Sequence, residues 1–357
     1  MKKIKFSIIT CVILIVSSFI VHEWIGFNFL KTCIKYPFSH ETTIMDNSVR
    51  LNIDVESLRQ IDNEYGDWLV HPCVRYIPEG FQGHKWWMVV TPYPKYNNYY
   101  ENPILYYGDE NSNYPPNKWH FVAVVQKSHK TGYNADGNLY FDGNKLWIFW
   151  KEKDTPNSVN SPTGNCVMGV SYDGNSFSNP KMFLDNNDSI DTRITAPCVM
   201  VINDTIKCLT TAITDIENRT SIRNHGNTQI AVWALSGSDL CNEVFKFQYD
   251  VKPVYPADFD FWHADYFKYK GLYYCVVSNQ AANKILLGKS INGIDYSFYE
   301  KPLLSTDGNL YTYMYKPSAV VVNEEFYLFY PRKLLKTNHV GIYMSHMKFE
   351  DVLQTVE

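Results

Sequence analysis

Residues 134–152, NADGNLYFDGNKLWIFWKE, hold the pattern that decides the fold. The stretch has a short polar start, an extended apolar run, a tight turn at Asp142-Gly143-Asn144, and a second run rich in β-forming residues, Leu146 to Trp150. Asp-Gly supplies the positive φ that such a turn needs, and apolar runs on both sides of it are typical of a hairpin. The stretch therefore predicts a β-hairpin.

Four other stretches repeat this pattern at intervals of roughly 50–70 residues, somewhat longer than the period of about 40–50 of a four-stranded propeller blade. They are HPCVRYIPEGFQGHKWWMVV from His71, TAPCVMVINDTIKCLTTA from Thr195, WHADYFKYKGLYYCVVSN from Trp262 and YKPSAVVVNEEFYLFYPR from Tyr315. A hairpin that cannot bury its own face must stack on its neighbours, and radial stacking closes such units into a ring. The sequence therefore predicts an all-β fold, a five-bladed β-propeller.

In such a ring the residue just before each inner strand lies at the mouth of the central channel. The repeats place these residues at His71, Asp136, Thr195 or Ala196, Asp265 and Lys316.

Composition is consistent with one large domain. The chain has 357 residues, of which 45% are hydrophobic and 20% charged, and the fivefold repeat favours a single propeller over residues 68–357, preceded by a connector over 31–67. The formal net charge of −4 provides no basic field for phosphate backbones, so we expect no nucleic-acid partner.

The N-terminus has the layout of a secretory signal. Lys2, Lys3 and Lys5 precede a largely apolar run from Phe6 to Val21, and Trp24 to Leu30 extend it toward the ~20 residues that a bilayer requires. Residues 1–30 therefore predict a transmembrane signal anchor, with a cleaved signal peptide as the alternative. Either places the propeller outside the cytoplasm, membrane-anchored or, if the signal is cleaved, secreted.

Three strand-opening segments carry a family resemblance: His71-Pro72, Asn134-Ala135-Asp136 and Thr195-Ala196-Pro197. The chain resembles the five-bladed propellers of the glycoside hydrolase family 43, 32 and 68 superfamily. In family 43 the corresponding segments are Asp-Pro, an Asp-Pro-Asp-like segment and Glu-(Gly/Ala)-Pro, which supply the general base, a carboxylate that tunes the acid, and the general acid. Only the middle carboxylate is present here.

A second segment gives a more specific resemblance. Trp86 to Pro94, followed by Glu101-Asn102-Pro103-Ile104, is similar to an uncharacterised bacterial subgroup of these propellers with a W-M-x-x-T-P-Y-P…E-N-P signature, often extracytoplasmic or connected with surface polysaccharides. The resemblance implies that Glu101 lies at the channel end, where it could replace the missing acid.

The main functional prediction is a glycoside hydrolase that binds a glycan in its central funnel. Glycosidic hydrolysis needs two carboxyl groups, and two that converge push their pKa values apart, as an acid and a base require. The predicted catalytic residues are Glu101, Asp136 and Asp265. The predicted substrate-binding residues are His71 and His263, the stacking aromatics Trp86, Trp87, Tyr93 and Trp262, and Arg75 and Arg332, which could bind a sugar carboxylate.

Three alternatives remain open. The first is a non-catalytic glycan-binding or surface-polysaccharide assembly protein, and the second is an interaction scaffold. The third is a metal site formed by His71, His263, Asp136 and Asp265, whose ligand types suit calcium, manganese or zinc. No close ligand motif supports the third, so the sequence predicts no metal and no cofactor.

Overall fold

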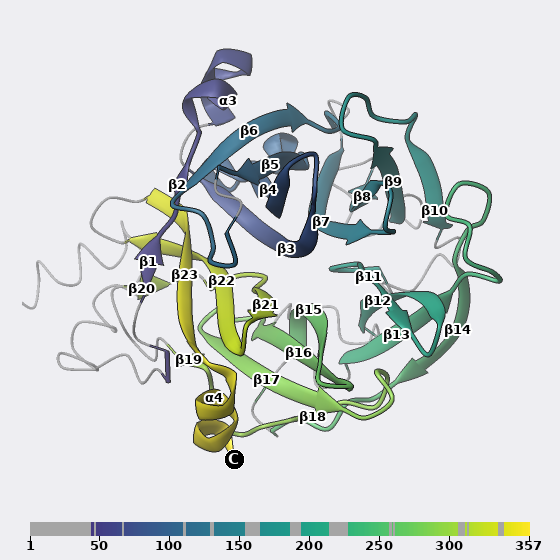
Figure 1. Cartoon of the computed structure of the whole chain (residues 1–357), viewed down its shortest axis with the longest axis vertical. Helices are drawn as coiled ribbons and strands as arrows, with labels where there is room; N and C mark the ends of the chain where they lie inside the picture. Colours follow the sequence, from purple (N-terminus) through teal and green to yellow (C-terminus); the bar gives the residue numbers. More distant parts are fainter. Residues whose placement is uncertain are drawn as a thin grey trace, which may run out of the picture.

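The structure is a computed structural model that describes residues 44–45, 48–65, 68–109, 112–128, 132–153, 165–185, 194–213, 228–256, 259, 261–305, 311–312, 314–334 and 339–357. Within these residues the strands form five sheets, antiparallel apart from one short edge strand, arranged as blades around a central axis (Figure 1). The chain runs once around the ring, as the colour gradient shows. The predicted five-bladed all-β propeller is confirmed.

Each blade contributes one inner strand beside the axis and one that returns antiparallel to it. The inner strands are β3 (Leu69–Phe81), β7 (Tyr133–Phe141), β11 (Cys198–Ile202), β15 (Phe261–Tyr269) and β21 (Ser318–Val322). Their hairpin partners are β4 (His84–Pro92), β8 (Leu146–Lys153), β12 (Thr205–Ile213), β16 (Leu272–Asn279) and β22 (Glu325–Leu334).

The third strands are β5 (Ile104–Gly108), β9 (Cys166–Tyr172), β13 (Thr228–Ala234), β17 (Lys284–Ser290) and β23 (His339–Lys348). The outer strands are β6 (Lys118–Val124), β10 (Lys181–Asp185), β14 (Lys246–Val251) and β18 (Ser297–Phe298), and short strands β19 (Leu304–Ser305) and β20 (Tyr311–Thr312) pair with β17 and β22.

The hairpin that motivated the prediction forms as expected. Phe141 pairs with Leu146 across the turn, and Gly143 adopts φ +97°. The Asp142 carboxylate accepts hydrogen bonds from the backbone N–H groups of Asn144 and Lys145, at 2.8 and 2.7 Å. An Asp side chain that caps its own turn in this way fixes the register of the strands on both sides.

Two short N-terminal strands close the ring. β1 (Val49–Arg50) pairs with β23 of the last blade, and β2 (Asn52–Ile53) adds to β6 of the first. Part of the stretch predicted as a connector, residues 31–67, therefore belongs to the propeller sheets. It also contains helix α3 (Glu56–Ile61) and the 3-10 turn η1 (Asn63–Tyr65).

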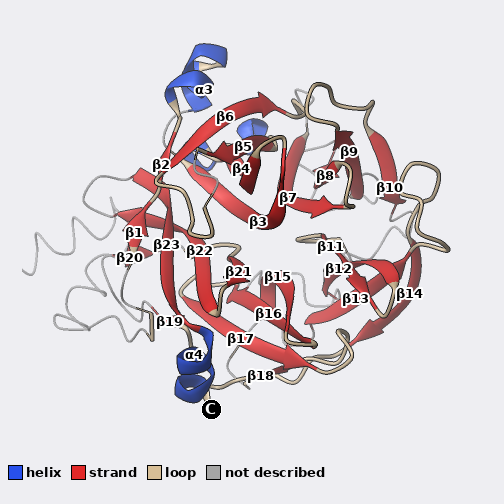
Figure 2. Cartoon of the chain, in the orientation of Figure 1, coloured by secondary structure: helices blue, strands red, loops and turns tan. Residues whose placement is uncertain are grey.

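Two helices lie at the periphery of the ring, α3 near the first blade and α4 (Phe349–Val356) near the fourth and fifth (Figure 2). In the described part of the chain, no helix combines the length and the apolar character that crossing a membrane requires. The predicted signal anchor, residues 1–30, lies outside the described residues.

The hydrophobic core is divided among the five contacts between neighbouring blades. One cluster joins Trp86 of β4 to Tyr327 and Phe329 of β22, and the next joins Trp87 of β4 to Leu139 and Ile148 of the second blade. Further clusters join blades two and three, three and four, and four and five. Both faces of a middle strand are therefore buried, because each blade is packed between two others.

A buried ion pair on the axis links all five blades. Arg75 of β3 binds Asp265 of β15 through two N–H···O bonds of 3.0 and 2.8 Å. The guanidinium also donates to the Leu139 carbonyl of β7 and contacts the Cys198 sulfur of β11, while Ser318 of β21 donates to Asp265 at 2.6 Å. We call this group the axial hub.

The axial hub gives a prediction about stability. Replacing Asp265 by Asn removes one partner of a buried pair and should lower the free energy of unfolding by about 3–5 kcal/mol at pH 7. Burial opposes ionisation of Asp265, but Arg75 outweighs it and lowers the pKa of this carboxyl below 3.8. Because the pKa of Asp265 is lower in the folded state, its contribution to stability is complete above the unfolded-state pKa of 3.8. This contribution is lost as the pH falls from there through the folded-state pKa.

Urea unfolding at pH 7 and at pH 3 measures the free energies of unfolding of the wild type and of Asp265→Asn. The difference between the two proteins should be smaller at pH 3 than at pH 7. The matched control is Glu324→Gln, which breaks the exposed pair of Glu324 with Lys270 and should change stability by about 1 kcal/mol or less. Equal effects of the two substitutions would contradict a structural role for the hub.

Candidate active site

A pocket of about 320 Å³ opens at the end of the channel where the inner strands begin. We call it the channel pocket. Its walls come from the inner strands, the end of β8, and the loop that holds the 3-10 turns η2 (Pro94–Tyr96) and η3 (Asn98–Tyr100). Its lining residues are His71, Tyr93, Tyr96, Asn98, Glu101, Tyr133, Ala135, Asp136, Lys151, Thr195, Trp262, His263 and Tyr315.

An unusual backbone conformation recurs where the inner strands begin. His71, Asp136, Ala196 and Lys316 all have positive φ, at 53°, 60°, 49° and 26°. The ladders of the first, second and fourth blades are also bulged at this level, and bulges redirect side chains. A left-handed conformation costs a non-glycine residue free energy and persists only where the surroundings enforce it, often at functional sites.

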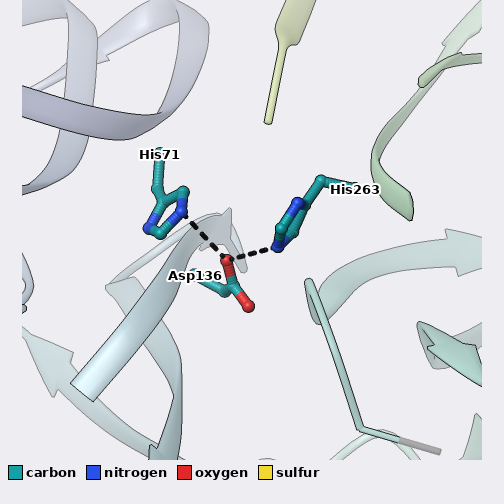
Figure 3. Close-up of side chains that lie close together, drawn as sticks. All are labelled: His71, Asp136 and His263. Carbon is teal, nitrogen blue, oxygen red and sulfur yellow. Dashed lines mark ion pairs between the residues drawn. The ribbon is translucent and has the colours of Figure 1, made fainter. Parts of the chain in front are cut away.

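Three of these redirected side chains converge on one point. His71 Nε2 lies 3.6 Å from Asp136 Oδ1, and His263 Nε2 lies 3.2 Å from the same oxygen (Figure 3). Their ligand-type atoms all lie within 4.8 Å of one another, and the three residues are at most 3% exposed. His71 Nε2 and His263 Nε2 therefore both face the same oxygen of Asp136.

Thr91 of β4 contacts the ring nitrogen of His71 that faces away from Asp136, and this contact bears on the tautomer of His71. The Thr91 hydroxyl lies 2.8 Å from His71 Nδ1, and it is also directed at the Val70 carbonyl, at 3.5 Å. When the hydroxyl donates to that carbonyl, its oxygen accepts a hydrogen bond from the N–H group at Nδ1. The tautomer of His71 is then fixed, with a lone pair on Nε2. The Nε2 atom directed at Asp136 is then a ligand and not a hydrogen-bond donor.

The electrostatics of the pocket keep both imidazole rings neutral at pH 7. Burial lowers the pKa of His71 to about 3, although Asp136 opposes it, and the pKa of His263 is also lowered by burial. Burial opposes ionisation of Asp136, yet His263, His71 and Lys316 hold its pKa well below the ordinary value. The cluster is therefore one carboxylate and two neutral imidazoles.

Glu101 lies in the same pocket but behaves in the opposite way. It is 6% exposed, and burial, followed by the charge of Asp136, raises the pKa of its carboxyl well above the ordinary value. The pocket thus holds two carboxyl groups whose pKa values are displaced in opposite directions. Carboxyl pairs with separated pKa values are the usual source of an acid and a base in hydrolytic sites.

The His71, Asp136 and His263 cluster has the composition of a divalent-metal site. Zinc binds imidazole nitrogen and carboxylate oxygen at about 2.0–2.2 Å, so ligand atoms around it lie roughly 3–3.5 Å apart, close to the two distances here. Two histidines and a carboxylate are a common catalytic donor set that leaves a position for water or substrate. The structure brings together three of the four residues of the metal hypothesis, without Asp265.

Six of the sequence-predicted site residues line the channel pocket: Glu101, Asp136, His71, His263, Tyr93 and Trp262. Trp262 donates its indole N–H to the Tyr315 hydroxyl at 3.2 Å and presents a half-buried ring to the pocket. Whether these residues act on a substrate remains a proposal.

The other predicted residues do not reach the pocket. Asp265 was placed at the channel mouth, but His263 occupies that position, and Asp265 is paired with Arg75 below it, at 1% exposure. Neither partner of this pair lines the channel pocket.

Trp86 and Trp87 are 0% and 2% exposed, and they pack on opposite faces of β4 against the two neighbouring blades. Arg332 of β22 contacts the Ser48 hydroxyl and the Tyr343 ring, outside the pocket lining. Burial of a middle strand on both faces explains why the two tryptophans are core residues.

Sequence analysis missed Thr91 and Lys151. Both lie on the second strand of a hairpin, next to the residues of the first strand that form the channel mouth. Thr91 pairs with Val70, and Lys151 pairs with Ala135. The signal was present in the hairpin pattern, because a strand that returns from the turn brings its last residues back to the level where its partner began.

Neither protein-family models nor curated protein sequences match this chain. Solved structures do. An N-acetylgalactosamine deacetylase from F. plautii, in complex with blood group B trisaccharide, superposes with a TM-score of 0.65 at 14% identity, covering 81% of this chain and 92% of that one.

Two glycoside hydrolases give similar matches. A β-xylosidase has a TM-score of 0.54 at 12% identity over 80% of this chain and 93% of its own, and a family-43 enzyme from Xanthomonas citri has 0.56 at 11% over 79% and 88%. At these identities the likeness concerns the fold. The chain has the five-bladed propeller fold that the family-43 glycoside hydrolases share with this deacetylase.

Proposed function

We propose that this protein is a metal-dependent carbohydrate deacylase, which hydrolyses an acyl group from a sugar amine or hydroxyl in the channel pocket. The observation that carries the proposal is the convergence of His71, Asp136 and His263 in one buried cluster, with their ligand-type atoms all within 4.8 Å of one another. Two imidazoles and a carboxylate at this spacing suit a divalent cation. The fold shared with a deacetylase that binds a trisaccharide is compatible with this function.

The roles of the residues follow from their positions. His71, Asp136 and His263 would hold a divalent cation, which when bound polarises a carbonyl and activates water. Glu101 retains a proton because burial raises its pKa, so it can protonate the departing amine or alkoxide. Trp262 offers an aromatic face on which a sugar ring can stack.

Thr91 would orient His71 from outside the cation site. A ligating histidine usually has its other ring nitrogen hydrogen-bonded, and this bond sets its tautomer and its direction. The 2.8 Å contact of Thr91 with His71 Nδ1 meets that requirement.

Glycosidic hydrolysis is the second candidate. Glu101 and Asp136 line the same pocket, and their pKa values are displaced in opposite directions. Asp265 cannot be the third member, since it is sealed in the axial hub. Non-catalytic glycan binding is the remaining alternative, and the aromatic lining alone would serve it.

Removal of metal distinguishes these candidates. Chelator-treated protein should release no acetate from N- and O-acetylated sugars, and added zinc or manganese should restore release. His263→Ala should lose both metal binding and activity, whereas Glu101→Gln should keep the metal and lower kcat by about 10²–10⁴.

Acetate release and p-nitrophenyl glycoside cleavage would be measured on the same preparations. Chelator-resistant glycoside cleavage that is lost in both Glu101→Gln and Asp136→Asn would establish the second candidate in place of the first. If the protein binds glycans but turns over neither acetylated sugars nor glycosides, the result would favour non-catalytic glycan binding over both enzymatic candidates.

The role of Thr91 is tested separately. Thr91→Val keeps the shape of the side chain but removes the acceptor for His71 Nδ1, so zinc affinity should fall by about 10–100-fold. Thr91→Ser retains the hydroxyl and should stay within a few-fold of the wild type. Competition with a chromophoric chelator measures both, and equal affinities for the valine and serine variants would show that the hydroxyl does not orient His71.

We further propose that the propeller lies outside the cytoplasm, held by the segment at residues 1–30. The support is the sequence alone: lysines followed by an apolar run. Protease added to intact cells or spheroplasts should degrade the propeller while a cytoplasmic marker survives. Protection of the propeller until the membrane is lysed would refute this location.

A further inference from the structure

Lys151 is a cation directed at the channel pocket whose hydrogen-bonding capacity is largely unused. It lies two residues before the end of β8, opposite Ala135, is half-buried and lines the pocket. Its ammonium group carries three N–H donors. This group makes one long hydrogen bond to Thr195 Oγ1, at 3.4 Å, and lies over the face of the Tyr133 ring, 6.0 Å away.

Other lysines of the same chain show what a satisfied ammonium looks like. Lys181 donates to three backbone carbonyls, at 3.1, 3.0 and 2.7 Å. Lys316, beneath the pocket and 1% exposed, donates to the Gly137 carbonyl at 2.7 Å. Lys151 differs from both, because its one hydrogen bond is long, at 3.4 Å.

The carboxylates of the pocket form no close ion pair with Lys151. Among the described residues, no carboxylate oxygen lies within 4.0 Å of Lys151 Nζ. Asp136 is turned toward the two histidines, at 3.2 and 3.6 Å, and acts on Lys151 only over a longer distance. A half-buried ammonium group with no close anion is a favourable partner for an anionic group of the ligand.

We propose that the sugar bound in the channel pocket is acidic, carrying a carboxylate as a uronic acid does, and that Lys151 binds this carboxylate. The inference rests on the proposed carbohydrate-binding role of the pocket and specifies its substrate class. A single ammonium matches the single charge of a carboxylate, whereas phosphate groups are generally bound by several donors. The cavity volume of about 320 Å³ is compatible with one sugar residue.

The test measures binding to metal-free protein, so that a carboxylate cannot be held by a bound cation instead. Calorimetric titration with methyl β-D-glucuronide and with methyl β-D-glucoside should give at least about tenfold tighter binding of the glucuronide. Lys151→Met should remove this preference and Lys151→Arg should keep most of it. The control, Lys246→Met on the exposed strand β14, should leave it unchanged.

Three results would overturn the proposal: equal affinity for the two sugars in the wild type, a preference that survives in Lys151→Met, or a stronger response to glucose 6-phosphate than to the glucuronide. Zinc binding is measured on the same preparations with a chelator. If zinc binds and the glucuronide preference is missing, only the substrate class is wrong. If the preference is present and zinc does not bind, the metal-dependent function fails and the acidic-sugar site stands.

Discussion

The axial hub is the interaction on which the arrangement of the blades depends. Arg75 reaches from the first blade to a carbonyl of the second, a thiol of the third and the carboxylate of the fourth, and Ser318 completes the group from the fifth. Apolar packing between blades is non-directional and would allow each to slide along its neighbour. Charged hydrogen bonds are directional, so the hub holds the five inner strands in a fixed position relative to one another along the axis of the propeller. The strand starts are consequently level, and the channel pocket lies directly above.

The same geometry separates the residues of the core from those of the candidate site. Side chains in the middle of a blade face a neighbouring blade on either side, which is why the two adjacent tryptophans of β4 both belong to the core. Residues of the candidate site therefore lie at the ends of the strands. There the left-handed residues turn His71 and Asp136 into the mouth at a conformational cost that the surrounding blades sustain.

The repeated hairpin was sufficient to predict the ring, because turn chemistry and apolar runs are local signals. His71 and Asp136 could be placed at the mouth for the same reason. The exchange of Asp265 for His263 is a matter of position along the strand: the two residues lie on the same face of β15, two residues apart, and the bulge between Phe261 and His263 alters how the start of the strand pairs. The metal hypothesis named the three residues of the cluster, but they are far apart in sequence, and no spacing rule could separate them from Asp265.

Ring closure by β1 constrains the order of folding. Val49 pairs with Met344, so the first strand of the described propeller bonds to the last, β23. During synthesis the first four blades can stack as they emerge, but β1 remains without its partner until β23 has been made. An exposed strand edge is a template for pairing with other chains. A truncated chain that lacks β23 would therefore expose β1 as an unpaired edge, which makes incomplete copies a specific aggregation hazard.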